Sequence, residues 1–259
     1  MTTQVLHKFL RIGLLLAAAS VLGRVHADGG GETTTSPSVL TNAVFWLDAA
    51  DISTLTFENG TMNVLQWKSK TADQRTATWS GAKPVYDTTT WGIPTVDFGG
   101  AGSRRNMTYD RVTGIRTVFC VIKIAKSGSI HLLCDSNYYS FHRGTGGAYL
   151  RTDLDQVAGS VVWDGWKSVT PATDIVPDDS FRVICVTRSA EGNSNCLAKD
   201  RNYNDRTGGK QYCELIVFNT VLSDADRTAV TDYLTAKWTE GTGWLDGSDL
   251  AQVRSASGD

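Results

Sequence analysis

The sequence predicts an all-β protein that carries one α-helix near its C-terminus. Its hydrophobic pattern either alternates with a period of two or consists of short apolar runs, most of them bounded by Gly, Asn, Asp or Thr. Alternation and short bounded runs are typical of β-strands rather than of helices. We therefore predict strands at residues 44–47, 64–67, 95–98, 116–124, 130–134, 138–142, 160–163, 181–187 and 212–218.

A tight turn supports the prediction of an antiparallel sheet. Asp164 and Gly165 separate the strand-like run 161–163 from the run 166–168. An Asp-Gly pair in this position is a strong hairpin signal, because the turn needs positive φ angles that these residues tolerate. We expect the hairpin to bring Trp163 and Trp166 close together.

One segment near the C-terminus has helical periodicity. Ser223 is suited to cap a helix, and Asp226 stands three residues later as a short capping-box acid. The apolar residues that follow recur at helical spacing, at Val230, Tyr233, Leu234 and Trp238. We expect this helix to pack its apolar stripe on the edge of the β-structure.

The first 27 residues have the pattern of a signal peptide. Lys8 and Arg11 precede an apolar run at 12–22, which is too short to span a bilayer comfortably. The Val-His-Ala sequence at 25–27 has small first and third residues, which fit a signal-peptidase site. The alternative is a buried N-terminal helix. Packing in a folded protein gives no reason for basic residues to be followed by an apolar run and then by small residues. We therefore expect export, with a secreted or cell-surface location.

We expect a single folded domain after this signal. Residues 28–38 are rich in Gly, Thr and Ser, cannot bury much apolar surface and are predicted to form a flexible leader. The folded domain is predicted to span 39–246, and residues 247–259 are predicted to form a C-terminal tail. No stretch within the domain has the composition of a linker, and no apolar run after the signal is long enough for a transmembrane helix.

The charge of the chain excludes some classes of partner. There are 25 basic and 27 acidic residues, which give a formal net charge of -2. A nucleic-acid footprint needs clustered Lys and Arg, whereas the longest cationic cluster is Arg104-Arg105, which we interpret as part of a solvated loop. We therefore expect no nucleic-acid partner and no electrostatic docking to a membrane.

Five cysteines follow the signal, at positions 120, 134, 185, 196 and 213, and an exported protein can form disulfides. A hairpin centred on Ser127 would place Cys120 opposite Cys134, and Cys185 and Cys196 are nearly symmetric about the turn at 190–192. Opposed cross-strand positions can lie within disulfide range. The alternative is that each cysteine is a small buried apolar residue of a strand. The odd number leaves at least one thiol unpaired, and the sequence does not decide the pairing.

An ordered set of segments resembles a known family. The segments are AVFWLDAAD (43–51), VLQWKSK (64–70), GIPTVDFGG (92–100), CELIVFN (213–219), LSDADR (222–227) and YL (233–234). Together they resemble the concanavalin A-like lectin/glucanase superfamily in its bacterial laminin-G-like form, over nearly the whole of 39–246. The resemblance implies a two-sheet antiparallel jelly-roll sandwich. It also implies an extracellular, non-catalytic module that binds a partner, which we expect to be a glycan.

Most residues of these segments have a structural interpretation. Asp48 and Asp51 are predicted to fall in a turn after the first strand, where aspartate side chains cap backbone amides. Calcium would need six to eight oxygen ligands, and no dense acidic loop is present, so we expect no calcium and no other cofactor. Asp97 is interpreted as a solvent-side strand residue. Three aromatic residues are predicted to lie in the core, namely Trp67, Phe98 and Trp238.

A divergent glycoside hydrolase is an alternative that the residues disfavour. Hydrolases of the superfamily resemble one another in a Glu-x-Asp-x-x-Glu strand, and retaining hydrolysis needs two carboxylates about 5 Å apart. The glutamates, at 32, 58, 191, 214 and 240, offer no such pair on one strand. The sequence also has no His-rich metal cluster, nucleophile elbow or phosphate loop, and Cys134 is interpreted as a packed residue rather than as a nucleophile for His142. We therefore expect that the protein is not an enzyme.

Two segments are candidate glycan-binding sites, since sugars bind to aromatic faces that have polar groups nearby. The candidates are the hairpin residues Trp163, Asp164 and Trp166 and the loop residues Asp200, Arg201, Tyr203 and Asn204. The alternative for the loop is an Arg–Asp network that only holds its conformation. The alternative function is that of a surface adhesion or structural module that contacts a cell-surface protein. Such a module would be expected to have a flat apolar patch on its surface rather than paired exposed aromatic residues.

Overall fold

The computed structural model describes residues 36–90, 92–126, 132–137, 161–169 and 179–239. The chain divides into two units, Met1–Glu32 and Thr33–Asp259, and all of the described residues belong to the second. The predicted signal peptide, most of the predicted leader, the predicted tail and the predicted strand at 138–142 lie outside the described residues. Within the described residues, no helix is long and apolar enough to cross a membrane.

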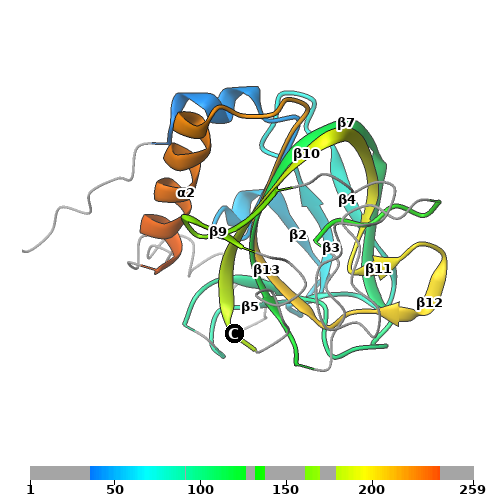
Figure 1. Cartoon of the computed structure of the whole chain (residues 1–259). Coiled ribbons are helices and arrows are strands. Elements are labelled where there is room, and N and C mark those ends of the chain that lie inside the picture. The colour runs from blue at the N-terminus through cyan, green and yellow to red at the C-terminus, as the bar shows by residue number, and fades with distance from the viewer. Residues whose placement is uncertain (1–35, 91, 127–131, 138–160, 170–178, 240–259) are drawn as a thin grey trace, which may run out of the picture. The chain divides into compact units, whose positions relative to one another are not determined.

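The described part of the chain consists mainly of β-strands, as Figure 1 shows. The strands are β1 (Phe45–Asp48), β2 (Leu55–Phe57), β3 (Val64–Lys68), β4 (Thr76–Gly81), β5 (Val85–Asp87), β6 (Thr95–Asp97), β7 (Arg105–Ile124), β8 (Val161–Asp164), β9 (Lys167–Val169), β10 (Phe181–Leu197), β11 (Lys199–Asp200), β12 (Tyr203–Thr207) and β13 (Lys210–Phe218). The helices are the short 3-10 helices η1 (Ser38–Asn42) and η2 (Ile52–Thr54) and the α-helix α2 (Asp224–Thr239). The predicted all-β class with one C-terminal helix is confirmed.

Two long strands, β7 and β10, organise the sheet, and Figure 1 shows them arching together across the molecule. One edge of β7 pairs with β10 along its length. The other edge pairs with β4 at its N-terminal end and with β13 at its C-terminal end. Between these ends Gly114 has a φ of +69°, a conformation that favours glycine and lets the strand change direction.

The division of β7 gives a sandwich-like arrangement. β2, β3 and β4 extend the sheet from the N-terminal half of β7, whereas β13 carries β1 and β6, and β5 follows β6. All pairings between named strands are antiparallel. The core contains large buried side chains from both sets of strands, among them Phe45, Trp67, Phe98, Phe119 and Phe218. The predicted core positions Trp67, Phe98 and Trp238 are buried.

Several strand predictions need correction. The segment 130–134 was predicted to be a strand, but residues 132–134 form only one isolated bridge, at Cys134. The predicted strand 116–124 is the C-terminal half of the longer strand β7. Five strands were not predicted from the sequence, namely β2, β4, β5, β11 and β12. Three of these strands, β2, β5 and β11, have only two or three residues, so they are too short for a clear alternation.

The predicted helix cap is confirmed in α2. The backbone N–H of Asp226 donates to Ser223 Oγ over 3.1 Å, and Ser223 Oγ donates to Asp226 Oδ2 over 2.7 Å. This pair satisfies one of the N–H groups that the first turn of a helix leaves without a partner. The apolar stripe is buried as expected, and the helix contacts β10 and η1.

The expected disulfide is not present, because all five cysteines are free and buried. Cys120 lies on β7 between Ile184 of β10 and Leu215 of β13. Cys134 forms its bridge with Cys196 instead, through two reciprocal backbone hydrogen bonds of 3.1 Å. Cys120 does not lie opposite Cys134 because both edges of β7 at this position are paired, one with β10 and the other with β13. The alternative interpretation, a small buried apolar residue, describes the observed environment of these side chains.

Candidate functional site

The predicted hairpin forms from β8 and β9, but its turn is one residue later than predicted. Asp164 pairs with Lys167, so the two turn residues are Gly165 and Trp166, and Gly165 has a φ of +58°. Trp163 lies within β8, opposite Ser168. The two tryptophans are therefore not opposite one another across the hairpin.

The two hairpin tryptophans have different environments. Trp163 is half-buried, packs against the core, and has the guanidinium carbon of Arg227 at 3.6 Å from its ring centroid. This cation–π contact occupies a face that a sugar would need. Trp166 is 55% exposed, and its Nε1 donates to Asp232 Oδ1 of helix α2 over 2.6 Å. Asp164 forms an ion pair with Arg182.

Substitution of the two tryptophans should separate their roles. We expect Trp163→Ala to lower the free energy of unfolding by about 3 kcal/mol, at the low end of the range for buried aromatic residues because this ring is only half-buried. Trp166→Ala should cost less than about 1 kcal/mol, since it removes one exposed hydrogen bond. Thermal unfolding of both variants measures this difference, and equal midpoints would contradict it.

The predicted loop site is a short hairpin made by β11 and β12. The buried Asp200 carboxylate accepts from Arg201 Nε over 2.9 Å and from Arg206 Nη1 over 3.0 Å. The guanidinium carbons of these two arginines lie 4.7 and 4.3 Å from the ring centroid of Tyr203. Asp200, Arg201 and Tyr203 thus lie together in a network that fixes the loop, which was the alternative interpretation. Asn204, the next residue of β12, lines a polar cleft.

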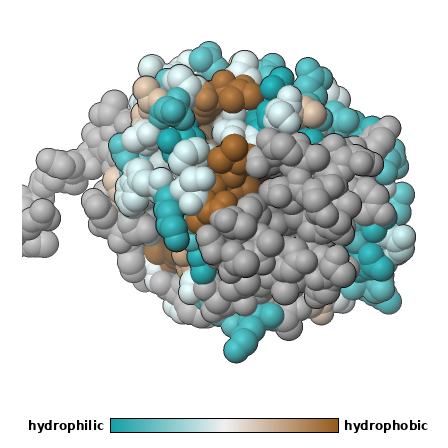
Figure 2. Space-filling model, in the orientation of Figure 1, coloured by the Kyte–Doolittle hydropathy of each residue, from teal (hydrophilic) through white to brown (hydrophobic). Residues whose placement is uncertain are grey.

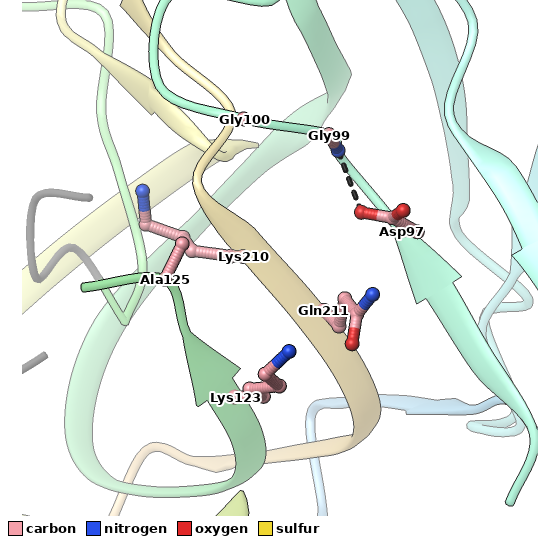
Figure 3. A pocket seen from close by; sticks show the side chains of 7 residues that line it. All are labelled: Asp97, Gly99, Gly100, Lys123, Ala125, Lys210 and Gln211. Atoms are coloured by element: carbon pink, nitrogen blue, oxygen red, sulfur yellow. Dashed lines mark hydrogen bonds between the residues drawn. The ribbon is translucent and has the colours of Figure 1, made fainter. Parts of the chain in front are cut away.

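A pocket of about 210 Å³ lies where β6, β13 and β7 run side by side (Figure 3). We call it the three-strand pocket. The residues that line it are Asp97, Gly99, Gly100, Lys123, Ala125, Lys210 and Gln211. Asp97, Gln211 and Lys123 come from three neighbouring strands, and the register pairs Gln211 with Asp97 on one side and with Lys123 on the other. Since directly paired residues point to the same face of a sheet, a carboxylate, an amide and an ammonium group form one row.

Hydrogen bonds hold part of this row and leave one buried acceptor without a partner. The backbone N–H of Gly99 donates to Asp97 Oδ1 over 2.6 Å, which orients the carboxylate (Figure 3). Gln211 Oε1 is buried and makes no hydrogen bond with any described residue. A buried oxygen without a donor is costly. The pocket therefore offers an acceptor that a donor on a bound molecule can satisfy.

A glycine-rich contact between two loops forms one wall of the three-strand pocket. The backbone N–H of Gly209 donates to Gly99 O over 2.7 Å, and that of Phe98 donates to Lys210 O over 2.9 Å. Gly99, Gly208 and Gly209 all have φ angles near +70°. Glycine adopts this conformation without strain, and its lack of a Cβ atom lets the two backbones approach closely. The pocket wall is thus held by backbone contacts.

This pocket was not predicted from the sequence. Asp97 was interpreted as a solvent-side residue, and Lys123 and Gln211 received no role. Each is a polar residue next to an apolar run, at Val96-Asp97-Phe98, Ile122-Lys123-Ile124 and Gln211-Tyr212. A polar residue at the edge of or within an apolar run was the feature of the sequence that could have indicated the pocket. Only the pairing of β6, β13 and β7 shows that the three side chains meet.

Charged groups elsewhere do not form a metal site in the described part of the chain. No group of three or more His, Cys, Asp or Glu residues lies close enough there to hold an ion. Asp48 and Glu214 lie opposite one another on β1 and β13. Because they belong to different strands, the spacing of carboxylates along one strand could not predict this pair. Both carboxylates are buried and bind Lys237, and neither lines the three-strand pocket. We assign this pair a structural role.

Comparison with known proteins gives no match: no family model, no curated protein and no solved structure matches this chain. The fold established by the strand pairing is an all-β, sandwich-like domain with a small polar pocket.

Proposed function

We propose that this protein is an extracellular, non-catalytic carbohydrate-binding module of the concanavalin A-like, laminin-G-like jelly-roll type, with the three-strand pocket as its sugar site. The fold supports the proposal at the level of an antiparallel, sandwich-like domain. The segments that resemble the family and the signal-like N-terminus support its finer part. The observation that carries the sugar site is the unpartnered Gln211 Oε1 between Asp97 and Lys123.

The row of three polar groups suits a sugar hydroxyl. A hydroxyl group donates one hydrogen bond and accepts others. It can donate to Gln211 Oε1 or to the Asp97 carboxylate, and a neighbouring hydroxyl can accept from Lys123. The pocket, at about 210 Å³, is smaller than typical ligand pockets, which suits a single sugar ring. Because no aromatic residue lines it among the described residues, we expect the affinity to be weak.

The same residues argue for binding rather than hydrolysis. Asp97 is the one acidic residue that lines the pocket among the residues described. Glycoside hydrolysis ordinarily needs two carboxyl groups, one as acid and one as base or nucleophile. The proposal therefore contains no chemical step.

The face in Figure 2 gives no support to a protein-binding patch on its described surface. Figure 2 shows the apolar residues of the described part of this face in a few separate areas. Among the residues that the structure describes, the exposed large apolar side chains are Trp79, Val161, Trp166, Tyr203 and Val221, which come from several separate elements. A stable protein contact would favour a continuous patch. We therefore keep carbohydrate as the proposed ligand.

A glycan array with the purified protein, run with and without calcium, tests the proposal. For the glycan that binds best, we expect Gln211→Ala to weaken binding about tenfold or more, since a lost hydrogen bond in a desolvated pocket costs about 1–3 kcal/mol. Thermal stability should not fall, because the variant removes a buried acceptor that has no partner. The control is Gln66→Ala, which changes an exposed glutamine of β3 and should leave binding unchanged.

Two results would count against the proposed function. An array on which no glycan is bound would remove carbohydrate as the ligand. A glycan that binds Gln211→Ala as tightly as it binds the unaltered protein would place the sugar site outside the three-strand pocket.

A further inference from the structure

A second polar cavity, which we call the Arg104 cleft, is built on the two chain segments that also form the glycine-rich wall of the three-strand pocket. It measures about 380 Å³ and is lined by Ser80, Gly81, Arg104, Asn106 and Asn204. Ser80 and Gly81 end β4, Arg104 directly precedes β7, Asn106 lies at the start of β7, and Asn204 lies in β12. The loop that contains Gly99 and Gly100 runs on to Arg104, and the strand that contains Asn204 runs on to Gly208. Both cavities are therefore built on the same pair of chain segments.

Asn106 supplies an unsatisfied acceptor in this cleft. The residue is 3% exposed, and its Nδ2 donates to the backbone carbonyl of Arg104 over 2.9 Å. A carbonyl can only accept a hydrogen bond, so this contact fixes which end of the amide is nitrogen. Asn106 Oδ1 is buried and has no hydrogen-bond partner among the described residues. Buried oxygens of this kind are rare in native proteins and call for a donor.

The backbone of Arg104 is held in a conformation that is unusual for arginine. Its φ is +63°, in the left-handed region that favours glycine. The backbone N–H of Arg104 donates to Thr207 Oγ1 over 2.8 Å, and its carbonyl accepts from Ala82 N over 2.9 Å. The structure around Arg104 therefore imposes this conformation. Strained residues that the surrounding contacts enforce occur preferentially at functional sites.

The close approach of β4 to Arg104 depends on a glycine. A Cβ atom on Gly81 would lie 2.5 Å from Arg104 O and 3.2 Å from Asn106 Nδ2, and Gly81 has a φ of +84°. A side chain at this position would push the Arg104 carbonyl away. The glycine thus lets three segments meet at one cleft.

The Arg104 cleft carries a positive charge that no carboxylate of the described residues neutralises. Arg104 is exposed, and its guanidinium forms no ion pair with any residue that the structure describes. None of the described residues that line the cleft is acidic. Arg201 and Arg206, by contrast, bind Asp200 and stack on Tyr203. Arg104 is therefore an arginine of this region whose guanidinium can form a bidentate contact with an anion from outside.

We infer that the Arg104 cleft binds an acidic sugar residue, whose anionic group pairs with Arg104 and whose hydroxyl group donates to Asn106 Oδ1. A ligand for this cleft needs an anion and a donor on one small molecule. A uronic acid has both, and so does a sulfated sugar. The saccharide part of this inference rests on the proposed function, and it specifies acidic glycans as the preferred class.

The test compares trigalacturonate with its fully methyl-esterified form, which has the same rings without the charge. We expect the acid to bind at least tenfold more tightly in 50 mM salt and to lose most of that preference in 0.5 M salt, because screening weakens an exposed ion pair. Arg104→Asn, chosen because asparagine tolerates positive φ, should abolish the preference and leave binding of the ester unchanged. Arg104→Lys should keep part of it.

Controls decide between the sources of any effect. Lys68→Gln removes an exposed cation of β3 and should leave the preference intact. A sulfated galactose is the second acidic probe, and inorganic sulfate tests for a simple anion site. Sulfate that competes as well as the acidic sugars would overturn the saccharide part of the inference. Equal binding of acid and ester, or an Arg104→Asn variant that keeps the preference, would overturn the site itself.

The results for the two cavities can be told apart. In the first case, a neutral sugar binds, Gln211→Ala weakens that binding, and the acidic sugar binds no more tightly than its ester. The proposed function then stands and this inference fails. If the acid binds through Arg104 but Gln211→Ala has no effect, the Arg104 cleft stands and the three-strand pocket fails. If neither neutral nor acidic saccharides bind, both fail.

Discussion

Lys237→Met is expected to lower the free energy of unfolding by about 3–5 kcal/mol, the cost of removing one partner from a buried ion pair. Lys237 Nζ of helix α2 donates to Asp48 Oδ2 over 2.6 Å and to Glu214 Oε2 over 2.8 Å. The two carboxylates lie directly opposite each other on β1 and β13. Methionine keeps the length and helix propensity of the side chain but leaves two buried carboxylates side by side without the cation between them.

The pKa directions within this cluster fit that role. Burial, and then the negative charge of Asp48, raise the pKa of Glu214, and Lys237 only partly opposes them. Burial also works to raise the pKa of Asp48, but the combined pull of Lys237 and Lys70 lowers it. For Lys237, burial works to lower the pKa, and the two carboxylates outweigh it, so the pKa is raised. The ammonium therefore stays charged in the folded protein.

Two further variants make the Lys237 prediction specific. Lys68→Met removes an exposed lysine of β3 and should change stability by less than about 0.5 kcal/mol. Glu214→Gln added to Lys237→Met should recover part of the loss, because it removes the carboxylate that has no other cation. The recovery is incomplete, since Trp46 Nε1 and Trp238 Nε1 donate to different oxygens of Glu214 and the single amide oxygen of glutamine can accept from only one of them. Chemical denaturation measures all three, and a Lys237→Met protein as stable as the parent would refute the role.

This cluster shows what the sequence can and cannot predict. Short-range patterns identified its parts to within one residue: the strand predicted to end at residue 47 ends at Asp48, the Asp48 carboxylate accepts from Ala50 N of the following turn over 3.0 Å, and the capped helix contains Trp238. The contact itself joins residues that are 189 positions apart. It depends on the pairing of β1 with β13 and on where α2 packs. Neither follows from local periodicity.

The same limit explains the register error at the predicted hairpin. The Asp164-Gly165 pair predicted a hairpin, and the hairpin exists, but a shift of one residue placed Trp163 against Arg227 instead of beside Trp166. A one-residue shift reverses the face of every side chain on a strand. The three-strand pocket needs two registers at once, those of β13 with β6 and with β7. Sequence reasoning therefore found the elements and missed the site that their pairing creates.

Gly208→Ala is the second variant for which we expect a large effect, a loss of about 2–5 kcal/mol. Gly208 has a φ of +72°, which costs an L-residue about 1–2 kcal/mol. The added Cβ atom would lie 2.7 Å from Phe98 O and would also collide with Ser103 Oγ and Gly100 O. Two of these three atoms belong to backbone, which cannot rotate away, so overpacking adds about 1–3 kcal/mol.

Gly60→Ala is the matched control for Gly208→Ala, because it isolates the contribution of the collision. Gly60 has a φ of +68°, but a Cβ atom there would have no other heavy atom within 4 Å. It should therefore cost only the 1–2 kcal/mol of the left-handed conformation. Since Gly100 lines the three-strand pocket, Gly208→Ala should also weaken glycan binding at temperatures where the variant is still folded, whereas Gly60→Ala should not. Equal losses of stability in the two variants would show that the close contact between the loops does not hold the pocket wall.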